Sequence, residues 1–329
     1  MSTSNNKNIN AAIIQHPPVF LNLNASIEKA VAYIEEAAKN GAQLIAFPET
    51  WLPGYPLWID SAPNAAIWGS PNAKAIFNVL FQNSLEIPGN HLTKLLEAAK
   101  QTGTYVIMGA NEKQGGTIYN TLIYIDKNGK YKVHRKLVPT YTERLVWGRG
   151  DGSTLTSMKT EFGTVGGLIC WEHWMPFARA FMHSKNEVVH LCQWPGVHDL
   201  HQLASRHYAF EGQCFVLAAG TFITKKEVLA GFDSLQNKNN TARDILASIK
   251  GNDDTVLYNG GSAFIAPDTN YVTEPLYGKS GIIYADLNLE LVNEGKLTMD
   301  SNGHYSRPDV FALTINDDVQ SNIKYKSET

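Results

Sequence analysis

The chain has 329 residues, of which 43% are hydrophobic and 18% charged, a composition that suits a globular protein with a sizeable core. Its 28 basic and 31 acidic side chains leave a net charge of −3, which argues against a nucleic acid or an anionic membrane as partner. The N-terminus lacks the apolar stretch of a secretory signal, no run of 18 apolar residues predicts a membrane span, and three cysteines do not make a disulfide framework. We therefore expect a cytoplasmic protein with one domain over residues 1–329, its core at about 9–315 and a short polar tail at 316–329.

The N-terminal third alternates apolar strands with helices. Asn24 is expected to cap a helix that runs to about residue 40, where Gly41 ends it, and a second helix over about 91–101 ends at Gly103. The strands expected around these helices are 9–15, 43–47 and 104–109. Residues 50–72, which are rich in proline, glycine and tryptophan, are expected to be irregular.

Hairpins are expected in the middle of the chain, followed by alternating helices and strands. The hairpin strands are 118–125 with 130–135 and 154–159 with 164–169. After them we expect a helix at about 176–185, a strand at 187–192, a helix at 200–212 and a strand at 214–219. The polar stretch 223–259, with one helical segment, is expected to be a surface excursion, and strands near 262–266, 271–274 and 281–286 complete the fold. This mixture predicts a layered α/β fold rather than a purely parallel sheet.

Three reactive side chains each follow a predicted strand. Glu49 follows QLIAFP, Lys136 follows YKVHR, and Cys170 follows VGGLI. Sites in α/β folds gather at the carboxyl ends of strands, where loops converge on a rigid scaffold. We expect these three side chains to meet at one edge.

Cys170 is the candidate nucleophile. It lies where a strand ends and a helix begins, a position that lowers the pKa of a thiol and exposes the sulfur. Cys192 and Cys214 lie in apolar strands without a neighbouring acid or base, so we expect them to be buried core residues.

A nucleophilic thiol needs a base, and the sequence offers two kinds. Histidine is the usual partner, and His173 and His190 are the candidates. Glu49 is better placed, because burial behind its strand would raise its pKa towards neutrality. An isolated glutamate at a strand end is, on its own, more often a solvated surface charge.

Lys136 is the candidate for stabilising negative charge on the substrate. Beside Arg135 at the end of a hairpin, a lysine is usually solvated, but one that points inward can hold developing charge. Glu143 follows seven residues later as a second carboxylate, with Lys136, Arg144 or no residue as its partner.

Aromatic residues cluster around these candidates. All seven tryptophans lie between residues 51 and 194, several of them in predicted loops beside Glu49, Glu143 and Cys170. Tryptophan is often plain core, but this clustering favours an aromatic-lined pocket for an arylaliphatic or aromatic substrate. The pocket residues that we expect are Tyr55, Trp58, Tyr141, Trp147 and Trp194.

Motifs for other chemistries are weak or missing. The glycine-rich GRGDG at 148–152 lacks the Lys-Ser/Thr of a phosphate loop, and there is no Gly-x-Ser-x-Gly. His198 and His201 lack a third ligand in register, so we expect no zinc site there.

The chain resembles the nitrilase superfamily of carbon–nitrogen hydrolases over residues 9–315. The resemblance is carried by FPET at 47–50, HRKLVPT at 134–140 and GGLICWEHWMP at 166–176. Three further motifs are similar to those of the true nitrilase branch: CWEH at 170–173, YTERLVWG at 141–148 and GHYSRPD at 303–309. The resemblance implies an α-β-β-α sandwich that forms a four-layer αββα-αββα dimer or a larger homo-oligomer.

The resemblance also implies the site and the reaction. Cys170 would be the nucleophile, Glu49 the base and acid, and Lys136 the charge stabiliser, with Glu143 as a second glutamate and the Trp171 backbone N–H as an oxyanion donor. A nitrile would pass through a thioimidate and a thioester to its carboxylic acid and ammonia, without metal or cofactor. An amidase or a cyanide hydratase of the same superfamily, a catalytically silent binding protein on this fold and a Cys/His protease are the alternatives.

Overall fold

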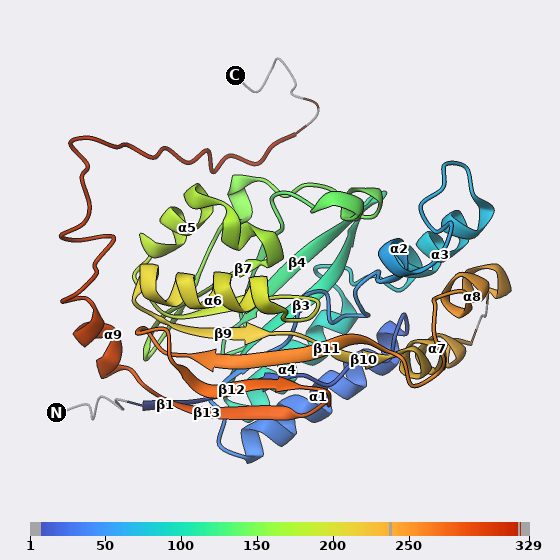
Figure 1. Cartoon of the computed structure of the whole chain (residues 1–329), viewed down its shortest axis with the longest axis horizontal. Helices are drawn as coiled ribbons and strands as arrows, with labels where there is room; N and C mark the ends of the chain where they lie inside the picture. Colours follow the sequence, from blue (N-terminus) through green and yellow to red (C-terminus); the bar gives the residue numbers. More distant parts are fainter. Residues whose placement is uncertain (1–7, 237–238, 322, 324–329) are drawn as a thin grey trace.

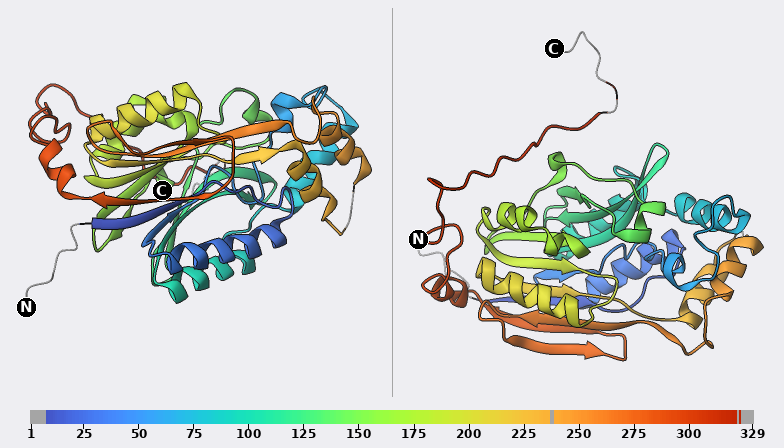
Figure 2. Two further views of the ribbon diagram at one scale, coloured as in Figure 1. Left: turned by 60° about the horizontal axis from the view of Figure 1, so that its bottom comes forward. Right: turned by 45° about the horizontal axis from the view of Figure 1, so that its top comes forward.

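Two β-sheets stacked face to face, with helices on both outer faces, form the body of the molecule (Figures 1 and 2). The structure is a computed structural model, which describes residues 8–236, 239–321 and 323. Strand β1 (Asn8–Ile14) illustrates why the layers form, because both of its faces are apolar. Ile9, Ala11 and Ile13 pack between the sheets, whereas Ala12 and Ile14 pack under helices. The α-β-β-α sandwich expected from the sequence is therefore confirmed for the single chain.

The first sheet has the strand order β13-β1-β2-β3-β4-β5. Its other strands are β2 (Leu44–Ala46), β3 (Tyr105–Gln114), β4 (Thr117–Ile125), β5 (Tyr131–Arg135) and β13 (Ile282–Asn288). Helices α1 (Leu23–Lys39) and α4 (Asn90–Thr102) cover its outer face, and Gly103 ends α4 in the left-handed conformation as expected. The predicted N-cap of α1 is wrong, because Asn22 accepts the capping bond from the Ala25 N–H and Asn24 lies inside the first turn.

The second sheet has the order β10-β11-β9-β8-β7-β6, with β12 paired to β11. Its strands are β6 (Met158–Thr160), β7 (Gly163–Ile169), β8 (Glu187–Gln193), β9 (Phe215–Ala219), β10 (Phe222–Thr224), β11 (Val256–Ile265) and β12 (Tyr271–Tyr277). Helices α5 (Pro176–His183) and α6 (Asp199–Gly212) cover its outer face (Figure 1). The expected strand at 154–159 is wrong in its first half, because residues Gly152–Thr154 form a 3-10 turn and β6 begins only at Met158.

A third apolar cluster lies at one end of the sandwich, where the sequence predicted irregular chain and a surface excursion. Four helices build it: α2 (Trp58–Ser61), α3 (Pro71–Gln82), α7 (Lys225–Asp233) and α8 (Asn240–Ala247). Figure 1 shows the two pairs side by side, although more than 140 residues separate them in the chain. Residues 50–72 are largely irregular as expected, apart from the short helix α2. The expectation of a surface excursion at 223–259 is wrong, because this stretch forms two helices that bury apolar side chains against α3.

The described chain after α9 (Glu290–Gly295) has turns but no helix or strand up to residue 321, and it runs along the surface (Figure 1). It returns to the body at Gln320, whose N–H donates to Asp151 Oδ2 at 2.9 Å. Residues 322 and 324–329 of the predicted tail lie outside the described residues. Within the described ranges, no helix is both long and apolar enough to cross a membrane.

Candidate active site

Glu49, Lys136 and Cys170 meet between the two sheets. Glu49 follows β2 and Lys136 follows β5 in the first sheet, whereas Cys170 follows β7 in the second. The Cys170 sulfur and one carboxylate oxygen each of Glu49 and Glu143 lie within 4.8 Å of one another. The expected convergence therefore occurs, across the sandwich rather than along the edge of one sheet.

Glu49 is buried on a tight turn that Gly109 of β3 makes possible. A Cβ at Gly109 would lie 2.1 Å from the Pro48 carbonyl oxygen, so only glycine lets the turn approach this closely. Glu49 Oε1 accepts bonds from Asn120 Nδ2 at 2.6 Å and Lys136 Nζ at 3.0 Å. Oε2 has no hydrogen-bond partner among the described residues. Burial raises the pKa of Glu49 to about 7, with Lys136 opposing the shift. One carboxylate oxygen is thus held in place while the other is available for a proton.

Lys136 is a fully buried cation between two carboxylates. Its Nζ donates to Glu49 Oε1 at 3.0 Å and to Glu143 Oε2 at 2.7 Å, and it lies 5.6 Å from the centre of the Trp147 ring. Burial alone would lower the pKa of Lys136, but the nearby Cys170, Glu49 and Glu143 outweigh it and raise that pKa. The lysine therefore stays charged, which is the state that stabilises a developing anion.

Glu143 has its hydrogen bonds filled by the protein. The Tyr55 hydroxyl donates to Oε1 at 2.8 Å, while the Thr140 N–H donates to Oε2 at 2.6 Å beside Lys136. Of the partners left open by the sequence, Lys136 is the one that the structure selects. A carboxylate held this firmly fixes the ammonium of Lys136.

Cys170 stands on a strained turn between β7 and the 3-10 turn Cys170–Trp174. Its φ of +53° is in the left-handed region, which costs a non-glycine residue about 1–2 kcal/mol. The Trp171 backbone and Lys136 each act to lower the pKa of the Cys170 thiol. The expectation of an exposed thiol with a lowered pKa is wrong, because burial, reinforced by Glu49, raises the pKa of Cys170 well above its ordinary value. The resting thiol is neutral and needs a base.

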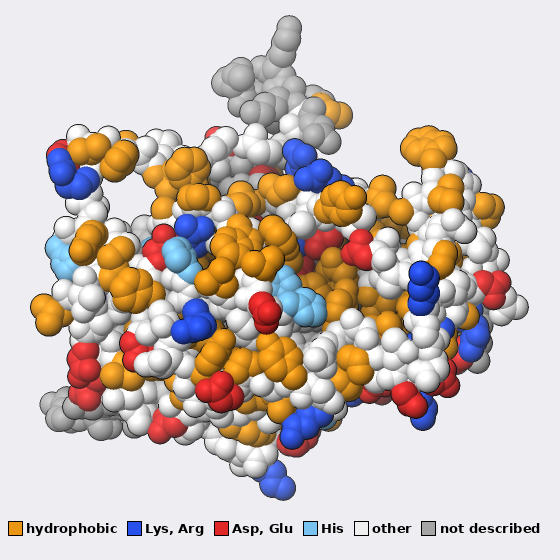
Figure 3. Space-filling view, viewed as in Figure 1, with side chains coloured by type: hydrophobic (Ala, Val, Ile, Leu, Met, Phe, Trp, Pro, Cys, Tyr) orange, Lys and Arg blue, Asp and Glu red, His pale blue; other side chains and the backbone are white. Residues whose placement is uncertain are grey.

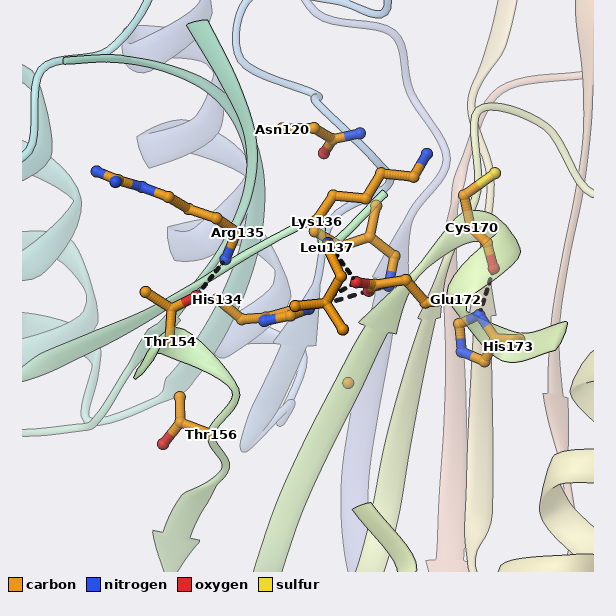
Figure 4. Close-up of polar contacts among 12 residues, drawn as sticks. Asn120, His134, Arg135, Lys136, Leu137, Thr154, Thr156, Cys170, Glu172 and His173 are labelled. Atoms are coloured by element: carbon orange, nitrogen blue, oxygen red, sulfur yellow. Dashed lines mark hydrogen bonds and ion pairs between the residues drawn. The ribbon is translucent and has the colours of Figure 1, made fainter. Parts of the chain in front are cut away.

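Glu172 ties the Cys170 turn to the Lys136 loop. Its carboxylate accepts the Ile169 N–H at 2.8 Å and the Leu137 N–H at 2.7 Å, and it lies 2.9 Å from His134 Nε2 (Figure 4). Burial opposes ionisation of Glu172, but these donors outweigh it and lower its pKa. No local pattern pointed to Glu172 or His134, whereas the polar Asn120 inside the apolar strand TIYNTLIYI was a signal that could have been used.

Neither candidate histidine is placed to act as a base towards the sulfur. His173 Nδ1 lies 2.7 Å from the Cys170 carbonyl oxygen, and His190 contacts His173. Figure 4 shows the sulfur and the carbonyl of Cys170 pointing in opposite directions, with His173 on the carbonyl side. Cys192 and Cys214 are buried in the core as expected.

The predicted aromatic pocket is only partly assembled. Tyr55 and Trp147 lie at the site, packed edge to face 5.4 Å apart. Trp194 is instead a core residue that bonds Ser205, Trp58 packs against Phe20, and the Tyr141 side chain is 80% exposed. Most of these rings therefore fill the protein interior or face solvent, and they do not support an aromatic substrate.

The model of the carbon–nitrogen hydrolase family matches residues 10–296, and the chain belongs to this family. It is 36% identical to an aliphatic nitrilase of Rhodococcus rhodochrous, covering 96% of this chain and 82% of the relative. It is 35% identical to an aliphatic nitrilase of Sinorhizobium fredii, covering 94% of this chain and 96% of the relative. Nitrilase 2 of Arabidopsis thaliana is 34% identical, with coverages of 100% and 97%.

Solved structures share the fold at low identity. A carbon–nitrogen hydrolase of Helicobacter pylori superposes with a TM-score of 0.68 at 16% identity, covering 93% of this chain and 98% of the other. Nit3 of Saccharomyces cerevisiae, a member of branch 10 of the nitrilase superfamily, superposes with a TM-score of 0.62 at 18% identity, covering 91% and 96%. The sandwich is thus the fold of this superfamily.

Proposed function

We propose that the protein is a nitrilase, which hydrolyses an organic nitrile to its carboxylic acid and ammonia. The observation that carries the proposal is the meeting of three groups between the two sheets: the Cys170 thiol, the buried ammonium of Lys136, and Glu49, one of whose oxygens has no hydrogen-bond partner among the described residues. The nitrilase relatives at 34–36% identity support the choice of nitrile over other carbon–nitrogen substrates.

The proposed first half of the reaction forms a covalent intermediate. Glu49 removes the thiol proton and the thiolate adds to the nitrile carbon, while the nitrogen takes the proton back from Glu49 to give a thioimidate. Lys136 and the Trp171 N–H stabilise the negative charge that develops during addition.

Two water molecules complete the proposed cycle. The first adds to the thioimidate carbon, and expulsion of ammonia leaves a thioester on Cys170. The second, deprotonated by Glu49, attacks the thioester and releases the carboxylic acid and the thiol. Release of the sulfur before ammonia would instead give an amide, which is the product expected of a nitrile hydratase activity. Relatives at 32–33% identity are called bifunctional nitrilase/nitrile hydratases, so the amide is a minor product to measure.

The substrate that we propose is a short aliphatic nitrile. The cavity beside Glu49 is small, with a volume of about 10 Å³, and is lined mainly by apolar side chains, with Tyr55 and Tyr258 among them. Pockets for drug-sized ligands occupy roughly 300–1,000 Å³. Two relatives are called aliphatic nitrilases, which agrees with a small apolar substrate.

A homodimer in a reducing, cytoplasmic setting is also proposed. Apolar side chains gather on the face formed by α5 and α6 (Figure 3), where Phe177, Leu200, Leu203 and Phe210 are exposed. Exposed apolar groups of this extent mark interaction surfaces, and pairing through this face would give the four-layer αββα-αββα arrangement. Cys170, Cys192 and Cys214 are free thiols, as a reducing compartment favours.

A nitrile panel with complete product analysis tests the function. Butyronitrile, benzonitrile, phenylacetonitrile, cyanide and butyramide are supplied separately, and ammonia, acid and amide are quantified. We expect butyric acid and ammonia from butyronitrile, with the highest kcat/KM of the panel. Preferential hydrolysis of butyramide would identify an amidase, formamide from cyanide a cyanide hydratase, and no turnover of any compound a silent binding protein.

A further inference from the structure

Behind the sulfur of Cys170, a row of buried polar side chains leads to the backbone of the nucleophile. His173 Nδ1 lies 2.7 Å from the Cys170 carbonyl oxygen, and its Nε2 lies 3.1 Å from His190 Nε2. His190 Nδ1 lies 3.0 Å from Glu187 Oε1, and the Tyr208 hydroxyl donates to Glu187 Oε2 at 2.6 Å. The proposed reaction uses none of these side chains.

The side chains of this row are buried and closely packed, unlike polar residues at the protein surface. Glu187, His190 and His173 are buried, and the Tyr208 ring stacks on His190 with centroids 3.7 Å apart. A Cβ at Gly166 of β7 would lie 1.3 Å from Glu187 Oε1, so the first glycine of GGLIC makes room for this carboxyl group. A glycine at position 166, four residues before the nucleophile, is therefore needed for Glu187 to occupy its place in the row.

Charged groups next to the row form ion pairs with one another and not with the side chains of the row. Glu211 accepts from Arg179 Nε at 2.6 Å and lies 3.0 Å from His183 Nε2. Arg179 also donates to the backbone carbonyl of His173 at 3.0 Å. His183 influences the pKa values of Glu187 and His190, and its Nε2 is engaged by Glu211. Glu172 influences His173 and His190, and its carboxylate is engaged by His134 and by backbone N–H groups.

The proton positions in the row follow from what each atom can accept. The Cys170 carbonyl only accepts, so His173 Nδ1 carries a proton and donates it. Burial lowers the pKa of His173 and of His190 well below the ordinary value, so both rings are neutral. His173 Nε2 is then an acceptor, His190 Nε2 donates to it, and His190 Nδ1 must accept. Its donor is the carboxylic acid form of Glu187, whose pKa burial raises to about 8.

We propose that Glu187, His190 and His173 form a neutral, proton-ordered chain that fixes the Cys170 carbonyl and so orients the nucleophile turn. The inference rests on the proposed function, in which Cys170 attacks the substrate. The three side chains are positioning residues, because they contact the backbone of Cys170 and not the reacting atoms. Since Cys170 has a positive φ, its peptide groups need a partner that holds them, and the same turn sets the direction of the Trp171 N–H.

Two substitutions at His173 distinguish the role of its hydrogen-bond donor from the role of its side-chain volume. The asparagine Nδ2 lies close to the position of the histidine Nδ1 and keeps the donor, whereas leucine removes it. We expect His173→Leu to lower kcat about 30–100-fold with KM changed less than about threefold, the scale of a misplaced reacting group. His173→Asn should recover kcat to within about threefold of wild type. His201→Leu, at a largely buried histidine without a bond to the nucleophile turn, is the matched control and should keep wild-type kcat.

The tautomers can be read on the wild-type protein, which avoids variants that fail to fold. With ¹⁵N-labelled histidine at pH 7, we expect a neutral Nδ1–H ring for His173 and a neutral Nε2–H ring for His190, assigned by their loss in His173→Asn and His190→Gln. A charged imidazolium, reversed tautomers or stoichiometric zinc bound between the two Nε2 atoms would overturn the chain. Equal kcat in His173→Leu and wild type would overturn its positioning role. Failure of the wild type to turn over any nitrile would reject the proposed function instead, and leave the tautomer result readable.

Discussion

The two sides of Cys170 are built from opposite kinds of chemistry. On the sulfur side lie Lys136, Glu143 and Glu49, a buried cluster in which charge is present or near its titration point. On the carbonyl side the row from Glu187 to His173 satisfies its hydrogen bonds with every member neutral. The side where charge moves during reaction is ionic, whereas the row that holds the geometry of the turn has no charged member.

The free energy lost when a buried group loses its partner differs between the two sides of Cys170. An ion buried without its partner costs about 3–5 kcal/mol, so the loss of one member of the Lys136 cluster should affect the others strongly. A neutral hydrogen bond contributes only about 0.5–1.5 kcal/mol. Substitutions on the sulfur side should therefore have the larger effects, and the predictions below run from that side towards the supporting contacts.

The largest effect is expected from removing the sulfur. Cys170→Ala should abolish nitrile turnover, because the covalent intermediate has no other attachment point in the proposed reaction. Ammonia release, measured with high enzyme concentration, checks this. Cys192→Ala and Cys214→Ala, which shorten core side chains, are the matched controls and should change folding stability but not the chemistry. An active Cys170→Ala enzyme would remove the basis of the account.

The charged partners come next. Glu49→Gln and Lys136→Ala should each lower kcat at least ~100-fold, the scale of a lost general base or of a lost anion stabiliser. Lys130→Ala, at an exposed lysine of the same hairpin, is the control for charge alone. Thermal unfolding shows whether each protein is folded. Near-normal turnover in folded Glu49→Gln would require a base other than this carboxylate.

An intermediate effect is expected from Glu172, whose carboxylate connects the Cys170 turn to the loop that follows Lys136. Glu172→Gln replaces one accepting oxygen with an amide donor that faces a backbone N–H, so we expect a loss of about 2 kcal/mol in the free energy of unfolding. Turnover should fall by about tenfold as the Lys136 and Cys170 loops separate. Urea unfolding and steady-state kinetics measure the two effects, with exposed Glu97→Gln as control. Unchanged stability would show that Glu172 does not join the loops.

The last prediction concerns the position of the pH profile rather than the size of the loss in rate. Glu49 must be ionised to accept the thiol proton, so kcat/KM should fall as the pH decreases through about 7. The negative charge of Glu143 raises the pKa of Glu49, and its removal in Glu143→Gln should therefore move this acid limb to lower pH, by about one unit. Profiles from pH 5 to 9 measure the limb. A shift in the opposite direction would mean that Glu143 acts mainly by holding Lys136.

The convergence of Glu49, Lys136 and Cys170 could be predicted because its signals are local. Apolar strands that end in Glu49, Lys136 and Cys170 are readable from a few neighbouring residues, and β2, β5 and β7 lie where the pattern indicates. Helix α3 was not predicted, and only one helix was predicted where α7 and α8 lie, since their apolar stripes become meaningful only when they pack together. The thiol pKa and the place of Trp194 also depend on burial by distant parts of the chain, which no local pattern records.

The central claim is that the Cys170 sulfur carries the acyl group during turnover. Wild-type enzyme quenched in acid during steady-state hydrolysis of butyronitrile can be digested and analysed by mass spectrometry. The account predicts a butyryl thioester on the peptide that contains Cys170, and unmodified peptides for Cys192 and Cys214. An acyl group on either of those cysteines, or on another residue, while the Cys170 peptide stays unmodified would contradict it.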